Sequence, residues 1–205
     1  ATYTVPAFLM RGDEPPVPIM PPLPTLAALN VIHWGVMRSA PDAHKQGVVV
    51  GLKGMGGQTT HHVHGDQGGF VLHAHGTEFF LDAGYGQGAP FKHSIPIPAE
   101  SDEELTKGDG KITGFHGEND APLINIWESG DLRTITIDST KAYSHQNVTR
   151  ADKVHRVFAL VGDKALVILD DVRPTEGRKV FTQYQVAKSP VIGSDQNFHI
   201  LRNGK

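Results

Sequence analysis

Histidines are concentrated in one part of the chain. Eight of the twelve lie between His33 and His93, and the densest run is His61-His62-Val63-His64. Imidazole is the commonest protein metal ligand, and its proton affinity lies nearest to neutral pH. Side chains alternate between two faces of an extended segment, so His62 and His64 point the same way. Two imidazoles on one face are the beginning of a metal site.

A carboxylate is expected to join them through a hairpin. Two apolar runs, residues 70–72 and 78–81, flank His75-Gly76. A tight turn there pairs the runs, with Leu72 opposite Phe79 and Gly69 opposite Asp82. Asp82 is thereby returned toward the end of the hairpin from which His62 and His64 enter.

These positions predict a metal site made of His64, Asp82 and one further histidine, for which we choose His93. Two imidazoles and a carboxylate suit zinc, which is normally four-coordinate. Magnesium and calcium prefer oxygen ligands, while iron and manganese stay open. His73 and His75 alternate with apolar neighbours, and we interpret them as ordinary polar positions on a solvated face.

Other residues admit a chemical and a plain interpretation. His62 is a candidate for proton exchange or for hydrogen bonding to an anion, or it is a surface histidine. Asp66 either orients a histidine or caps a glycine-rich turn. Arg38 either pairs with a substrate carboxylate or is an exposed strand-end arginine. Tyr85 and Tyr143 are either proton donors or packing residues.

Composition bounds the partners. The 205 residues fit one domain, or a domain with an appendage. A net charge of −3 with dispersed signs predicts no nucleic-acid or anionic-membrane partner. The chain has no cysteine, which excludes disulfides, thiolate zinc sites and cysteine nucleophiles. No apolar stretch approaches the roughly 20 residues that span a bilayer.

The pattern along the chain predicts an all-β fold. Seven of the fourteen prolines lie in residues 1–24, so we expect residues 1–28 to form an extended linker. The remainder, 29–205, is predicted to be an antiparallel two-sheet β-sandwich with one helical turn or two in 99–107. The expected strands are 46–53, 69–75, 77–82, 132–138, 154–161, 164–172 and 178–187. A turn signal near the end predicts truncation of the sandwich there.

One ordered set of motifs resembles the heparinase II/III-like family of polysaccharide lyases. Its central part comprises His62-Val63-His64-Gly65-Asp66, Gly69-Phe70-Val71-Leu72, Gly76 and Leu81-Asp82-Ala83-Gly84-Tyr85. It extends upstream to Gly35-Val36-Met37-Arg38-Ser39 and residues 48–53, and downstream to Arg156-Val157-Phe158 and residues 166–172. The resemblance thus covers roughly residues 30–190.

The resemblance implies a β-sandwich that belongs to a larger toroid-plus-sandwich lyase. In that family a helical toroid precedes the sandwich, and the active site lies between them. His64, Asp82 and His93 would then hold a zinc that organises the site. His62 would face the substrate uronate as a catalytic residue. From their residue types, we also expect Arg38 and Tyr85 to bind substrate.

The implied reaction is β-elimination in an acidic, uronic-acid-containing polysaccharide. Family members supply a tyrosine acid or base from the toroid. Residues 1–28 cannot encode a toroid. We therefore expect this chain alone to be incomplete as an enzyme. We expect the complete enzyme to be periplasmic or secreted.

Two other classes compete. One is a non-catalytic carbohydrate-binding or interaction module that retains a structural metal. The other is a cupin-like metal enzyme, prompted by the pair His62 and His64. The glutamate that this pattern expects a few residues later is absent, because Gly68 and Gly69 stand there.

Overall fold

The computed structural model describes residues 22–43, 46–56, 63–84, 89–106, 115 and 119–187, and the backbone of 191–192 and 198–199. Two antiparallel sheets dominate these residues. The first contains, in spatial order, β1 (Leu26–Leu29), β2 (Trp34–Arg38), β3 (Val48–Lys53), β4 (Gly69–Ala74) and β5 (Thr77–Phe80). The second contains β12 (Ala165–Pro174), β11 (Ala151–Val161), β8 (Leu132–Asp138) and β7 (Leu123–Ser129).

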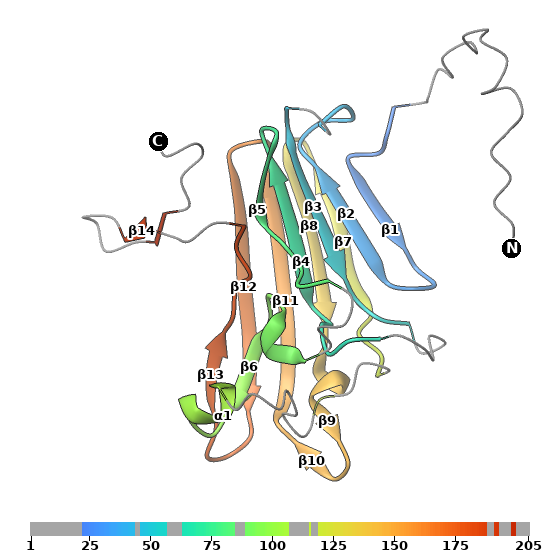
Figure 1. The fold of residues 1–205 in the computed structure, drawn as a ribbon. Coiled ribbons are helices and arrows are strands. Elements are labelled where there is room, and N and C mark those ends of the chain that lie inside the picture. The colour runs from blue at the N-terminus through green and yellow to red at the C-terminus, as the bar shows by residue number, and fades with distance from the viewer. Residues whose placement is uncertain are drawn as a thin grey trace, which may run out of the picture.

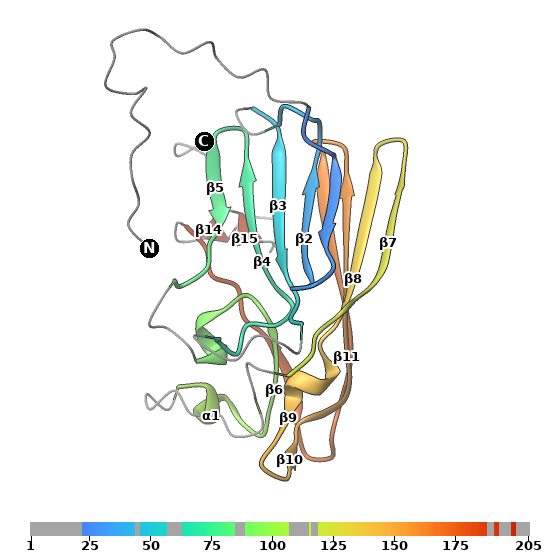
Figure 2. The same cartoon turned by 90° about the vertical axis from the view of Figure 1, so that its right-hand side faces the viewer.

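The two sheets pack face to face. Figure 1 shows the five-stranded sheet in front of the four-stranded sheet, and Figure 2 shows the two layers from the side. Alternate residues of each strand point into the space between them and form the main core. Its buried residues include Met37, Val50, Leu52 and Phe70 from the first sheet and Ile135, Ile137, Phe158 and Leu160 from the second.

Short elements gather below the sandwich in the view of Figure 1. They are β6 (Pro96–Ala99), which pairs with β13 (Lys179–Thr182), the helix α1 (Asp102–Thr106), and the pair β9 (Ser144–His145) and β10 (Val148–Thr149). Two 3-10 turns, η2 (Pro90–Lys92) and η3 (Thr140–Tyr143), connect them to the sheets. A further pair is β14 (Val191–Ile192) with β15 (Phe198–His199).

The predicted all-β antiparallel sandwich is confirmed. Each of the seven expected strand regions contains a strand, and the expected helical turn is α1. The prediction missed β1, β2, β6 and β7 and the short strands β9, β10 and β14. β6 has proline at two of its four positions, which disfavours a strand in general but is tolerated here beside a single partner strand.

Two details of the hairpins differ from the prediction. The turn at His75-Gly76 is present, with φ of 50° and 74°, as a type I′ turn requires. Leu72, however, pairs with Phe80 rather than Phe79, because a β-bulge follows the pairing of His73 with Glu78. The β11–β12 turn contains three residues rather than two, since Val161 pairs with Ala165.

The first strand begins at Leu26, three residues before the expected start of the sandwich at 29. The proline-rich stretch lies almost entirely outside the described residues. Within the described part of the chain, no helix has the length and apolar character needed to cross a membrane.

Candidate metal centre

A tight turn before β4 positions the first carboxylate. The Gly68 N–H donates to the Lys53 carbonyl at 2.7 Å, and the Gly69 N–H donates to the Asp66 carbonyl at 2.8 Å. Gly68 has a φ of +82°, and a Cβ there would lie 2.8 Å from the Ser139 Oγ. The turn therefore requires glycine at this position, and it places Asp66 at the end of β3.

His93, at the end of η2, lies close to His64 and Asp66. It caps η2, with its N–H donating to the Pro90 carbonyl at 3.1 Å, and its side chain is fully buried. Its ring centroid lies 5.5 Å from that of His64. The ligand atoms offered by His64, Asp66 and His93 all lie within 4.8 Å of one another. These three residues form the candidate metal cluster.

Asp82 fixes the orientation of the His93 ring. The His93 Nδ1 donates to the Asp82 Oδ2 at 2.7 Å, and the Gly84 N–H donates to the Asp82 Oδ1 at 2.9 Å. The hydrogen bond from His93 holds the pKa of Asp82 below its usual value, against the effect of burial. A carboxylate accepts only, so the neutral imidazole carries its proton on Nδ1 and leaves the Nε2 lone pair for a metal.

Two buried atoms of the cluster fit a cation. The His93 Nε2 and the Asp66 Oδ1 have no hydrogen-bond partner in the described part of the protein. Such atoms are costly to bury unless something satisfies them. The Lys53 Nζ holds the other oxygen of Asp66 at 2.6 Å. Two imidazoles and one carboxylate are a donor set that zinc accepts, with a fourth position left for water or another group.

The structure thus groups a different carboxylate with the histidines than the sequence predicts. Asp66 belongs to the compact cluster, whereas Asp82 contacts His93 through Nδ1. The sequence interpretation of Asp66 as the residue that orients a histidine fits Asp82 instead. A direct bond from Asp82 to the metal stays a prediction.

Arg156 ties the two ligand-bearing segments together. It is fully buried on β11, and its Nη1 donates to the carbonyls of Gly68 at 2.8 Å and Ser94 at 2.6 Å. Its Nε donates to the Asp170 Oδ1 at 2.6 Å, which neutralises the buried charge. The cluster is therefore held by the second sheet as well as by the first.

Comparison with solved structures identifies the fold. A heparinase III gene product superposes on 86% of this chain with a TM-score of 0.62 and 16% sequence identity. The chain matches part of heparinase III in fold. The heparan sulfate lyase HepC from Pedobacter heparinus gives a TM-score of 0.60 over 93% of the chain at 20% identity.

The matches cover only a fraction of those proteins. This chain spans 26% of the heparinase III gene product and 28% of the heparan sulfate lyase. No protein-family model matches the sequence, and no curated protein matches it. The likeness to heparinase III is therefore a likeness of fold, carried by the three-dimensional arrangement.

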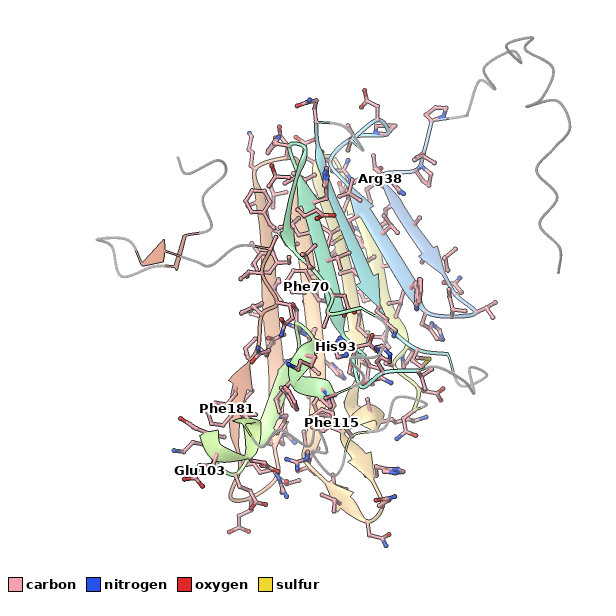
Figure 3. All side chains as sticks on the ribbon, viewed as in Figure 1. Arg38, Phe70, His93, Glu103, Phe115 and Phe181 are labelled. Atoms are coloured by element: carbon pink, nitrogen blue, oxygen red, sulfur yellow. The ribbon has the colours of Figure 1, made fainter. Side chains whose placement is uncertain are left out.

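Of the other predicted site residues, those that the structure describes lie outside the cluster. His62 and Tyr85 lie outside the described residues, so their roles stay predictions. Arg38 lies at the opposite end of the five-stranded sheet from His93 (Figure 3), and its Nη1 donates to the Pro24 carbonyl at 3.0 Å.

Tyr143 is buried, which raises its pKa, and its hydroxyl donates to the Pro96 carbonyl at 2.7 Å. These contacts favour a packing role for Tyr143 over that of a proton donor.

Sequence reasoning missed Lys53 and Arg156 as parts of the site. The position of Arg156 could have been predicted from the pattern of its strand. It alternates with Val154, Phe158 and Leu160, all of which are buried on the inner face of β11. A charged residue at an inward position needs partners, and the site supplies them.

Proposed function

We propose that this chain forms the β-sandwich domain of a polysaccharide lyase that cleaves a uronic-acid-containing polysaccharide by β-elimination. A zinc ion, held by the candidate metal cluster, organises its site. The supporting observation is that this chain combines a fold like part of heparinase III with a cluster of two histidines and an aspartate, of which His93 and Asp66 are buried. His62, the proposed substrate-facing residue, precedes His64 by two positions.

The reaction sets the demands on the site. A base removes the proton at C5 of the uronate, and the carboxylate gains enolate-like charge. The C4–C5 double bond forms as the bond from C4 to the leaving oxygen breaks, and that oxygen takes up a proton. Groups that stabilise the developing anion contribute most to such a step.

The residues of this chain supply part of that constellation. His62 donates a hydrogen bond to the uronate carboxyl group, and Arg38 and Tyr85 contact the substrate. Asp82 orients His93, and Lys53 orients Asp66, so the segment that carries His64 is held in place. When bound, zinc adds fixed positive charge and anchors this segment. A helical toroid provides the general base and acid, and the enzyme acts in the periplasm or outside the cell.

A binding module with a structural metal is the second candidate. The full burial of His93 and the 4% exposure of Asp66 favour it, because structural zinc sites are closed whereas catalytic sites keep an open position. Such a module would bind the same acidic polysaccharides and leave them intact.

The deciding experiment follows the ultraviolet absorbance of the unsaturated uronate product. The complete product of the gene and the 205-residue chain are each incubated with heparan sulfate, other glycosaminoglycans and alginate. Absorbance that rises with the complete product supports the lyase. Binding of a polysaccharide without any rise in absorbance favours the module.

A further inference from the structure

A hollow of about 500 Å³ lies beside the candidate metal cluster, on the outer face of the five-stranded sheet. Two cross-strand rows of residues form it. One row is Leu29, Trp34, Lys53 and Gly69, and the next is Val36, Gly51 and Val71. Gly51 lacks a side chain between its neighbours, so the floor of the hollow is low. His64, Asp66 and Asp82 also line it.

The wall of this hollow is apolar and aromatic. Leu29, Trp34 and Val71 are 53%, 46% and 41% exposed, which is high for large apolar residues on one face of a sheet. An indole ring beside a shallow floor offers a flat surface for the C–H face of a sugar ring. Apolar walls with a few convergent polar groups are typical of small-ligand sites.

The polar groups of the hollow stand on the side of the metal cluster. Lys53 follows Trp34 in the first row, and its ammonium group contacts Asp66. One ammonium against the carboxylates of Asp66 and Asp82 leaves one net negative charge. A bound divalent cation changes this to one net positive charge, so the hollow attracts anions only when the metal is present.

Arg38 extends the same face. It stands in line with Val49 and His73, two rows beyond Trp34. Four residues of strand place the two rows about 13 Å apart. A cation at each end with an apolar strip between them suits an extended chain of sugars that carries repeated acidic groups.

We propose that this hollow binds one ring of an acidic polysaccharide, with the ring against Trp34 and its carboxylate or sulfate group toward Lys53. Binding requires the divalent metal. The class of ligand and the presence of the metal rest on the proposed function, whereas the subsite itself rests on the hollow, the indole and the charges.

The two tryptophans of the chain allow a matched test. Trp127 lies on β7 in the other sheet and is 49% exposed, close to the value for Trp34. In Trp127→Phe, the fluorescence reports on Trp34 alone. This variant is titrated with a heparan sulfate tetrasaccharide, with zinc present and after chelation, and with the neutral cellotetraose as a control.

We expect a saturable change of Trp34 fluorescence with the acidic tetrasaccharide and zinc, and none with cellotetraose or after chelation. Calorimetry on Trp34→Ala should show Kd raised about tenfold, equivalent to ~1.4 kcal/mol, while Trp127→Ala binds as the unaltered chain does. Equal binding by Trp34→Ala and the unaltered chain would overturn the subsite, as would equal response to the neutral sugar. An absence of sugar binding would also overturn the subsite. The exposed apolar residues of this face would then be assigned to contact with a protein.

These results are separable from a failure of the proposed function. Trp34-dependent binding without any unsaturated product supports the subsite and rejects the lyase. Unsaturated product that forms equally with Trp34→Ala in the complete gene product supports the lyase and rejects the subsite.

Discussion

At the scale of single residues, the cluster depends on which group each of two carboxylates contacts. Asp82 holds the His93 Nδ1, and Lys53 holds one oxygen of Asp66. The other ligand atom of each residue, the His93 Nε2 and the Asp66 Oδ1, is buried without a hydrogen-bond partner among the described residues. Both residues belong to the candidate metal cluster. The sequence was sufficient to select His64, His93 and an aspartate. It favoured Asp82 as that aspartate, because the bend of residues 66–69 that brings Asp66 to the histidines cannot be derived from the local sequence pattern.

Asp82→Asn tests this division of roles. The amide keeps the shape and can still accept from His93, but it loses the negative charge that supports the ring. We expect zinc affinity to fall about 10- to 100-fold, as is usual for residues that support a metal ligand. Competition with a chromogenic chelator measures the affinity, and Asp66→Asn should abolish binding. Equal losses for the two variants would instead make Asp82 a direct ligand, as predicted from the sequence.

At the scale of elements, the turn of residues 66–69 is the feature that brings the ligands together. The Gly68 backbone supports β3, contacts Arg156 and adopts a left-handed conformation. Gly68 and Gly177 have nearly the same φ, so a comparison of alanine at the two positions separates the effect of steric contact from the effect of the left-handed backbone. Gly177 has a φ of +81° but nothing within 4 Å of an added Cβ.

Gly177→Ala should lower the free energy of unfolding by about 1 kcal/mol, the cost of a left-handed alanine. Gly68→Ala should lower it by at least twice as much, because its methyl group meets Ser139 and Arg156 at 2.8 and 3.1 Å. It should also weaken zinc binding, and Gly177→Ala should not. Urea denaturation and zinc titration measure the two effects. Equal losses of stability would show that the space around Gly68 is not restrictive.

The elements themselves were predictable where local signals are strong. The His75-Gly76 turn and the alternating apolar residues of β11 and β12 identify their hairpins without further information. The bulge in the β4–β5 hairpin could not be predicted from the sequence, because it depends on how Phe79 and Phe80 pack against the core. β6 could not be read either, since its partner β13 lies about 80 residues away and proline obscures the pattern.

At the scale of the whole molecule, Arg150 fastens the short elements below the sandwich. It is buried, its Nη1 donates to the Pro98 carbonyl at 2.8 Å, and its Nη2 donates to the Glu104 Oε1 at 2.5 Å. The contact joins α1 and β6 to the start of β11. The hydrogen bond from Arg150 holds the pKa of Glu104 below its usual value of 4.5.

A carboxyl group with a lowered pKa stabilises the fold above its unfolded-state pKa, and this contribution disappears as the pH falls through the folded-state value. Glu104→Gln should therefore lower the free energy of unfolding by about 1–2 kcal/mol at pH 7. The difference from the unaltered chain should shrink below pH 4.5. Glu176→Gln, at an exposed position, serves as the control. Denaturation curves across this range would contradict the assignment if the difference stayed constant.

Metal analysis tests whether one compact cluster holds a metal in this fold. The unaltered chain, His64→Ala and His73→Ala are purified after exposure to zinc, freed of loose metal, and analysed by mass spectrometry of the elements. His73 is the matched control, since it lies on the same sheet outside the cluster. We predict one zinc per chain for the unaltered protein and for His73→Ala, and almost none for His64→Ala. Equal zinc content in all three proteins, or no zinc in the unaltered chain, would show that this cluster does not hold the metal.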